Sequence, residues 1–343
     1  MSNFTPKVKR VSSSDREQIK VAFALAKDKR FDEALSGFQE IIKKQPSSKL
    51  AHLGAGNMLF KQKRYDEALI HFRTVMRLDP LMPQAPLAAG RVHLRQGRFE
   101  QAIEEFQTAL SIDPTLPQPY RGIGQVLIKQ QKYDEAIQQL RQAQRLDPQL
   151  ISVRLQIAQI YQRQGKLAEA LSEVQSALNI APKEWRTYQA LGRLYLRREE
   201  YNAAIEAFRD VIKLNPEVRP GTRLGLVKAL TEDNHLDEAV EILQQVPKSK
   251  ALEPRKHKLW GDIYQRQGLL KEAAEEYQAA SLLAAEQGNT LEDLASVDAL
   301  LEEEEEQWEE VLETYSAAAE QRIADAQKRR FDDIRSRRTG GKS

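Results

Sequence analysis

The sequence has no cysteine, no long apolar run and almost no net charge, and each absence excludes a class of protein. Without cysteine, the 343-residue chain cannot form disulfides, use a thiolate in catalysis or bind zinc through thiolates. No stretch approaches the ~20 apolar residues of a membrane-spanning helix, and the first residues lack the apolar core of a secretory signal. We therefore expect a cytoplasmic protein. Because 52 basic and 50 acidic residues leave a net charge of only +2, an electrostatic function requires local segregation of charge.

The sequence also lacks the motifs of catalysis and of metal binding. None of its five histidines lies in a His-x-His or His-Glu-x-x-His arrangement. The acidic run Glu302–Glu306 lacks the alternating ligands and sharp glycine turn of a calcium loop. Gly341-Lys342-Ser343 resembles the end of a phosphate-binding loop, but Ser336 stands where that loop needs its first glycine. We expect no enzymatic activity, no cofactor and no bound metal.

What the sequence does contain is a repeat of 34 residues. Prolines mark it at this spacing: Pro46, Pro80, Pro114, Pro148, Pro182 and Pro216. Alanines mark it too, with a single step of 35 residues before the seventh: Ala34, Ala68, Ala102, Ala136, Ala170, Ala204, Ala239 and Ala273. A fixed period of 34 is the signature of stacked helical hairpins.

Each unit contains two apolar stripes at helical spacing, separated by a short turn. In residues 117–150 the two stripes are Tyr120, Ile123, Gly124 and Leu127, then Ala136, Leu140 and Ala143. The turn carries residues that tolerate the left-handed conformation at a helix end, namely Gly97, Gly165, Asn234 and Gly268. Asp-Glu-Ala then opens the second helix at 32–34, 66–68, 134–136 and 237–239, which predicts Asp as its N-cap.

These units resemble the tetratricopeptide repeat. The unit that begins near residue 185 matches the family pattern at Tyr188, Leu191, Gly192, Tyr195, Ala204, Phe208, Val211 and Pro216. The resemblance covers about residues 15–287, with repeats that begin near residues 15, 49, 83, 117, 151, 185, 220 and 254. The chain departs from the pattern at Pro86, at an insertion near Gly221, and at Ala285 in place of the last proline. The resemblance implies an all-α, right-handed solenoid of about eight hairpins whose concave face contacts ligands.

The repeat positions also assign three of the histidines to packing. His52 and His257 fall at the fourth position of their repeats, and His93 falls at the eleventh. Both positions belong to the buried stripe of the first helix, so we expect these side chains to pack between helices.

The segments outside the solenoid, which spans 14–288, differ in composition. We expect a disordered basic tail over 1–13, a helical segment over 289–338 and a disordered end over 339–343. Leu294, Val297, Leu301, Trp308, Val311, Tyr315 and Ala318 approximate a coiled-coil heptad seam in this segment, broken by Glu304. The last four of these residues also mimic the second helix of a degenerate ninth repeat. We favour the ninth repeat, as a capping helix, because a solenoid end must cover its apolar face.

Cations recur on the expected inner side of the first helices. The thirteenth position of the repeat carries Lys27, Lys61, Arg95, Lys129, Arg163, Arg197 and Arg266, with Glu232 in the seventh repeat. Further cations on the same side are Arg91, Arg121, Arg193 and Lys228. The pattern predicts a basic groove for an acidic or extended peptide. Alternatively, these cations reflect only the preference of a helix end for positive charge.

Apolar residues occupy the same inward positions in the first two repeats: Ile19, Phe23, Leu53 and Phe60. They predict a hydrophobic site for a peptide side chain, or a contact with the N-terminal tail. The family's carboxylate clamp for chaperone tails uses Lys and Asn where this chain has Ile19 and Phe23. We therefore expect a ligand of another kind.

The sequence thus favours a non-enzymatic scaffold, adaptor or assembly factor that binds a protein partner in a basic groove. The alternative is a factor that binds nucleic acid or the ribosome through the groove cations and the Arg-rich tail. Charge is segregated at that end, because 298–313 contains nine acids and no base, whereas 328–343 contains seven bases and two acids. The tail could therefore also contact an anionic membrane or fold back on the acidic segment.

Overall fold

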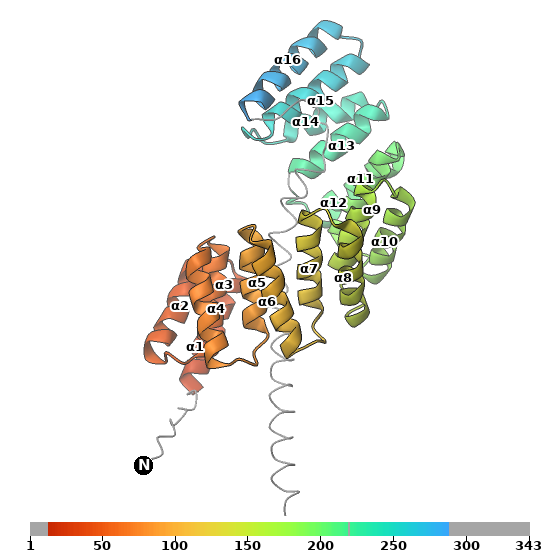
Figure 1. Ribbon diagram of the computed structural model, residues 1–343. Coiled ribbons are helices and arrows are strands. Elements are labelled where there is room, and N and C mark those ends of the chain that lie inside the picture. The colour runs from red at the N-terminus through yellow and green to blue at the C-terminus, as the bar shows by residue number, and fades with distance from the viewer. Residues whose placement is uncertain (1–12, 219, 288–343) are drawn as a thin grey trace, which may run out of the picture. The chain divides into compact units, whose positions relative to one another are not determined.

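The computed structural model describes residues 13–218 and 220–287, and over these residues the chain is helical, without strands (Figure 1). Sixteen helices follow one another: α1 (Ser13–Lys27), α2 (Phe31–Lys44), α3 (Lys49–Lys61), α4 (Tyr65–Leu78), α5 (Gln84–Arg95), α6 (Phe99–Ile112), α7 (Pro117–Lys129), α8 (Tyr133–Leu146), α9 (Ile151–Arg163), α10 (Leu167–Ile180), α11 (Trp185–Arg197), α12 (Tyr201–Leu214), α13 (Pro220–Glu232), α14 (Leu236–Gln245), α15 (Glu253–Arg266) and α16 (Leu270–Glu286).

Each odd-numbered helix packs on the helix that follows it, so the described chain forms a row of hairpins. We call the odd-numbered members the first helices and the even-numbered members the second helices. The all-α repeat fold predicted from the sequence is confirmed, whereas its handedness stays a prediction. The predicted tail, C-terminal helical segment and disordered end fall on 1–12 and 288–343, outside the described residues. The described residues divide into two compact units, 13–147 with α1–α8 and 148–287 with α9–α16.

A left-handed residue ends the first helix in all eight hairpins. The positive φ angles lie at Lys29, Lys63, Gly97, Gln131, Gly165, Glu199, Asn234 and Gly268. Glycine is therefore not required for this turn, although a side chain in this conformation costs about 1 kcal/mol or more.

The predicted aspartate N-cap is wrong. The N-cap of α2 is Arg30, whose backbone N–H donates to Leu25 O at 3.0 Å across the turn. The helix therefore begins two residues earlier than predicted, and Asp32 lies in its first turn, where the helix dipole favours its charge. Its carboxylate then accepts a hydrogen bond of 2.8 Å from Gln62 Nε2 of the next hairpin. Gln96 Nε2 donates in the same way to Asp66, at 3.2 Å.

Aromatic rings of the second helices pack between glycines of two successive first helices. In the first unit, the buried ring of Phe106 lies against Gly90 of its own hairpin and Gly122 of the next. A Cβ added at these glycines would lie 2.7 Å and 2.5 Å from ring atoms, closer than van der Waals contact allows. In the second unit, Phe208 lies between Gly192 and Gly225 in the same way.

Where the second helix carries a smaller side chain, the next first helix carries a larger one. Val174 is followed by Ala190, and Leu243 by Leu259, at the position that glycine occupies next to phenylalanine. The volume at each junction is therefore shared between two residues about 16 positions apart, as close packing of the interior requires.

The histidines predicted to pack between helices behave differently from one another. His52 and His93 are buried, with 8% and 4% of their surfaces exposed. His257 is half-buried, and its Nδ1 lies 2.6 Å from Glu276 Oε2 of α16, so it forms a polar contact. His52 lies between two partners, with Nε2 3.0 Å from Pro46 O and Nδ1 2.9 Å from His71 Nδ1. Because a carbonyl only accepts, His52 Nε2 carries a hydrogen, and in the neutral pair His71 Nδ1 donates to His52 Nδ1.

The glycine–phenylalanine junction can be tested with Gly122→Ala. The added Cβ would meet the rigid ring of Phe106, and overpacking of this kind costs roughly 1–3 kcal/mol. A gain in helix propensity of about 1 kcal/mol offsets part of that cost. We expect a net loss of up to about 2 kcal/mol of unfolding free energy, measured by urea denaturation, and a smaller loss in the Phe106→Leu background. An equal loss in both backgrounds would show that the ring is not the cause.

Gly37→Ala is the matched control for this experiment. Gly37 lies within α2, and its added Cβ would make an ordinary contact of 3.4 Å with Ala22 Cβ. We expect this change to stabilise the protein by up to about 1 kcal/mol, because only the helix propensity changes.

The His52–His71 pair predicts a loss of stability at mildly acidic pH. Burial, and then the charge of His52, hold the pKa of His71 below its usual 6.5, while Glu67 acts in the opposite direction. The unfolded chain therefore binds more protons at this site, so the contribution of His71 is complete above pH ~6.5 and falls as the pH decreases. His71→Asn keeps a hydrogen-bonding group without a titration. We expect its urea midpoint to fall less between pH 7.5 and pH 5.5 than that of the unchanged chain; an equal fall in both would contradict this assignment.

Candidate binding face

The structure places every predicted cation on a first helix. They come from α1 to α15 in order: Lys27, Lys61, Arg91, Arg95, Arg121, Lys129, Arg163, Arg193, Arg197, Lys228 and Arg266. Five are exposed, namely Lys27, Lys129, Arg163, Arg197 and Arg266. Lys61, Arg91, Arg95 and Lys228 are half-buried. Arg121 and Arg193 keep only 7% of their surfaces exposed, so these two are not open to solvent.

Five consecutive first helices contain no acidic residue. These helices are α3, α5 and α7 in the first unit and α9 and α11 in the second. Each carries two or three lysines or arginines. Two of these, Arg154 and Arg186, are not among the cations predicted from the repeat pattern. The neighbouring second helices α4, α6, α8, α10 and α12 each carry two or three acids. We call the sides formed by the first helices α3, α5, α7 and α9, α11 the acid-free faces.

The sequence already contains this signal, which becomes visible once the helix bounds are known. The thirteenth position alone gives seven cations and one acid, which a helix-end preference also explains. The absence of acids along the whole length of five helices is a separate observation.

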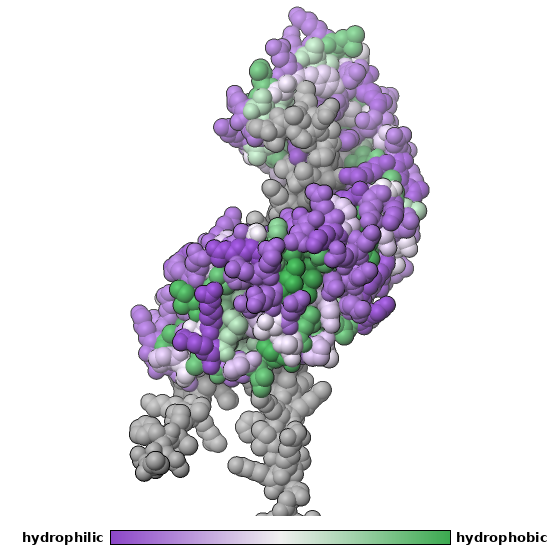
Figure 2. All heavy atoms as spheres, viewed as in Figure 1, coloured by the Kyte–Doolittle hydropathy of each residue, from purple (hydrophilic) through white to green (hydrophobic). Residues whose placement is uncertain are grey.

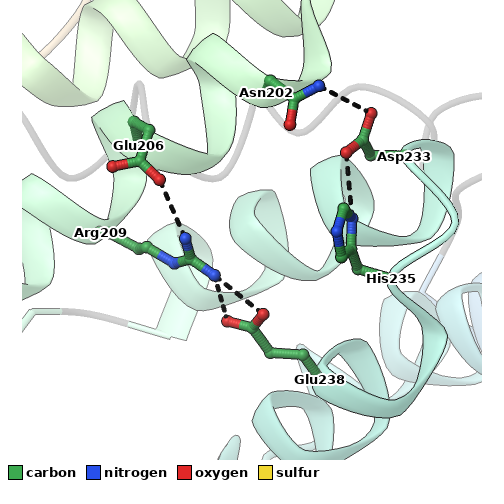
Figure 3. A network of polar contacts seen from close by, with 6 residues as sticks. All are labelled: Asn202, Glu206, Arg209, Asp233, His235 and Glu238. Atoms are coloured by element: carbon green, nitrogen blue, oxygen red, sulfur yellow. Dashed lines mark hydrogen bonds and ion pairs between the residues drawn. The ribbon is translucent and has the colours of Figure 1, made fainter.

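The second helices balance their own charges, as α12 and α14 illustrate (Figure 3). Arg209 donates to both carboxylate oxygens of Glu238 at 2.8 Å and to Glu206 at 2.9 Å. The hydrogen bond with Glu238 is the main cause that raises the pKa of Arg209. Beside this pair, Asn202 donates to Asp233 at 3.3 Å, and His235 Nδ1 lies 3.0 Å from the same carboxylate. Arg209 is thus held by one acid of its own helix and by one acid of the next hairpin.

The four apolar residues predicted to form a peptide site are mostly part of the core. Ile19 and Phe60 keep only 7% and 8% of their surfaces exposed. Phe23 is half-buried, and its ring packs edge-on against Phe38 at 5.0 Å between centroids. Leu53 is half-buried and packs on the same cluster. Little of this surface is therefore available to a partner, because the rings fill the space between α1, α2 and α3.

Phe60 instead supports cations in the first unit. The guanidinium of Arg91 on α5 lies 5.3 Å from the Phe60 ring centroid, and Lys61 Nζ lies 5.8 Å from it. Cation–π contacts of this kind stabilise the positive charges of Arg91 and Lys61, whose own helices carry no carboxylate. The charges of Lys61 on α3 and Arg91 on α5 therefore lie beside the same ring.

Polar contacts link the first helices of the second unit. Arg197 Nη1 of α11 donates to Gln162 O of α9 at 3.4 Å. Gln189 Nε2 of α11 donates to Thr222 Oγ1 of α13 at 3.1 Å. Further along, Arg266 of α15 forms an ion pair with Glu232 of α13. Glu232, which stands at the thirteenth position where the other repeats have a cation, thus neutralises Arg266 at the same position of the next repeat.

The visible surface is mainly hydrophilic, with small separate hydrophobic areas (Figure 2). Among the helices described, none is both long and apolar enough to span a bilayer. Within the same residues, no group of three or more histidine and acidic side chains is arranged to hold a metal ion.

Comparisons with solved structures find the same architecture. The Cut9–Hcn1 hetero-tetramer of the APC/C matches with a TM-score of 0.59 at 16% identity, over 74% of this chain and 50% of the other. This chain therefore spans about half the length of that neighbour. PilF of Pseudomonas aeruginosa matches with a TM-score of 0.50 at 17% identity, over 60% and 93% of the two chains. A repeat protein of Thermus thermophilus gives 0.48 at 23% identity, over 52% and 98%. At their identities of 16% and 17%, the first two of these matches show a shared fold alone.

Family models match along most of the described chain. One, described as TPR repeat, matches residues 90–131 and 124–165. Three, described as tetratricopeptide repeat, match residues 24–83, 149–217 and 195–259. No curated protein matches the chain by sequence. The models together cover more than half of the sequence, and the chain belongs to the tetratricopeptide repeat family.

Proposed function

We propose that the protein is a non-enzymatic scaffold that binds an acidic segment of a partner protein along its acid-free faces. The observation that carries this proposal is the absence of acids from α3, α5, α7, α9 and α11, each of which carries cations. A surface with one sign of charge attracts the opposite sign and disfavours partners of its own sign.

The helix dipole does not account for this charge distribution. The dipole favours cations in the last turn of a helix, which suits Lys61, Arg95 and Lys129. It equally favours acids in the first turn, and the first turns of these five helices have none. Four of the five second helices of the same hairpins follow the dipole rule at their first turns, with acids such as Asp66 and Glu67, and α12 is the exception. The first helices are therefore selected for positive charge beyond what helix stability requires.

A protein partner fits the faces better than nucleic acid does. Binding of single-stranded nucleic acid combines cations with exposed aromatic rings on which bases stack. On α3, α5 and α7 the aromatic residues are Phe60, which is buried, and Tyr120, which is half-buried. On α9 and α11 none is fully exposed either: the half-buried rings there are Tyr161, Trp185, Tyr188 and Tyr195. Cut9, which shares the fold, is found in a hetero-tetramer with another protein, Hcn1. Nucleic acid is the alternative ligand, and nuclease treatment distinguishes it from a protein partner.

The proposal predicts that charge reversal on the first helices removes a partner without unfolding the chain. The variant combines Arg95→Glu, Lys129→Glu, Arg163→Glu and Arg197→Glu, all at exposed or half-buried positions. The immobilised full chain and the variant would each be incubated with lysate, with and without nuclease, and bound proteins quantified by mass spectrometry. We expect the main partner to be reduced at least tenfold by the variant, and to be released as salt increases, because such contacts are screened within ~10 Å.

The matched control reverses four cations in the last turns of second helices: Lys43→Glu, Arg77→Glu, Arg145→Glu and Lys213→Glu. These residues are exposed and occupy equivalent places relative to a helix dipole. The net charge changes by the same amount, so only the face differs. Retention of the partner by the control, together with loss in the first variant, supports the proposal. Equal binding by all three chains contradicts it, as does loss of every protein partner after nuclease treatment.

A further inference from the structure

We propose that residues 291–308 form a single helix that packs antiparallel along the uncovered side of α16. The occupant of that side is therefore a named segment of this chain, and the segment is one capping helix rather than a ninth hairpin. The inference is independent of the proposed function, because it concerns a different surface.

The aromatic ring of α16 is covered less than its equivalent in the preceding hairpins. Phe208 of α12 is fully buried between Gly192 of its own hairpin and Gly225 of the next. Tyr277 stands at the same repeat position in α16, lies against Gly261 of its own hairpin and is only half-buried. One side of this ring thus has the place that a following helix fills elsewhere.

The exposure continues along the same side of α16. Ile205 of α12 keeps 3% of its surface exposed, whereas Ala274 at the equivalent place of α16 is exposed. Leu270, in the first turn of α16, is 69% exposed. The uncovered residues recur at intervals of four, three and four, which is the spacing of a coiled-coil seam: Leu270, Ala274, Tyr277 and Ser281.

The hydroxyl group of Tyr277 is compatible with a helix packed over its ring. It donates to Asp262 Oδ1 at 2.9 Å and lies 2.8 Å from Gln265 Oε1, both on α15. Because the hydroxyl is satisfied within its own hairpin, a helix that covers the ring leaves no unpaired polar group there.

The sequence that follows α16 carries a stripe with the same spacing. Its apolar members are Leu294, Val297, Leu301 and Trp308, and Glu304 takes the remaining place. Thr290 is a favourable N-cap for such a helix. No glycine, asparagine or proline occurs from 290 to 339, so nothing in this stretch ends the helix before Trp308.

A ninth hairpin fits the same residues less well. If Trp308 opened a second helix, Asp298 and Glu302 would take the seventh and eleventh positions of the first helix. In α13 these positions hold Leu226 and Leu230, which keep 1% and 0% of their surfaces exposed. Carboxylates are costly at such buried places, whereas a single helix leaves both of them off its apolar stripe.

The connection to α16 has the length that joins antiparallel neighbours in this unit. The chain leaves α16 at Gln287, whose Nε2 donates to Lys250 O at 2.7 Å. Four residues, 287–290, separate α16 from Leu291, as the four residues 181–184 separate α10 from α11. Loops of two to five residues are typical of such helical hairpins.

The short connection determines which residues lie opposite each other. Phe208 lies six residues before the end of α12, and Gly225, which it contacts, lies five residues after the start of α13. Residues at similar distances from a short loop are thus opposed. Tyr277 lies nine residues before the end of α16, and Leu301 lies ten residues after Leu291.

The same count brings a large side chain to the exposed start of α16. Leu270 lies 16 residues before the end of α16, and Trp308 lies 17 residues after residue 291. Glu304, which interrupts the apolar stripe, falls opposite the small side chain of Ala274. Lys271, one turn from Ala274, is the single base of α16 and is exposed. The two stripes therefore match in spacing and in size.

The test uses paired cysteines in the full chain, which has no cysteine of its own. One variant combines Ala274→Cys with Glu304→Cys. The matched control combines Ala274→Cys with Glu302→Cys, which moves the second thiol about 200° around the proposed helix. We expect the first pair to form a disulfide within one chain at least tenfold faster, measured by non-reducing electrophoresis at low protein concentration, because only that pair reaches the ~6 Å Cα separation of a disulfide.

A second pair of variants tests the stripe without cysteine. Leu294→Asp with Leu301→Asp should lower the urea midpoint of the second unit by roughly 0.5 M or more. Ala295→Asp with Ala299→Asp, on the opposite side of the proposed helix, should leave it unchanged. Tryptophan fluorescence follows the second unit and this segment alone, because the three tryptophans of the chain are Trp185, Trp260 and Trp308.

The outcomes are distinct from those of the proposed function, since no cation of the acid-free faces is altered. Equal disulfide rates for the two cysteine pairs overturn the inference, because the segment then has no fixed register on α16. An unchanged urea midpoint in the Leu294→Asp, Leu301→Asp chain overturns it as well. A disulfide that joins two chains assigns the segment to a second copy, which also overturns the inference.

Discussion

The packing of a flat ring between two helices is the constraint on which the described hairpins depend. Phe106 reaches Gly90 in its own hairpin and Gly122 in the next, so one side chain fixes both the hairpin and the step to its neighbour. Glycine at these places costs helix propensity, and the buried ring offsets that cost. Where the ring is replaced by Val174, the matching place is filled by Ala190. The volume available at the junction, rather than helix propensity, therefore decides which residue stands there.

This packing also determines which sides of the helices remain for binding. The first helices turn glycines such as Gly90 and Gly122 to the rings, and five of them carry cations but no acids, whereas the second helices that follow these five carry two or three acids each. On the second helices, Arg209 is held by Glu206 and Glu238, so charge is balanced by local pairs. On α9 and α11 the pairing acids come from outside the helix, because Arg154 pairs with Glu173 at 3.6 Å and Arg186 with Glu184 at 3.0 Å. The first helices α3, α5, α7, α9 and α11 thus carry cations and no acids of their own, whereas second helices such as α4, α8 and α12 carry both.

The proposed binding function concerns the acid-free faces. Cations that pair within their own surface contribute little to recognition, because their charge is already compensated. We propose that the cations of α3, α5, α7, α9 and α11 attract an acidic segment of a partner, because these helices carry no acid of their own.

The sequence by itself determined the fold, since prolines and alanines 34 residues apart are tied to positions that every hairpin must fill. It also located the cations, because their spacing follows the helical period. Only the tertiary structure decided that Ile19 and Phe60 belong to the core and that Arg121 and Arg193 are buried. It alone placed Asp32 inside α2 rather than at its N-cap. The physical reason is that exposure and capping depend on where neighbouring helices lie and where each helix begins, and a repeat pattern gives only the period.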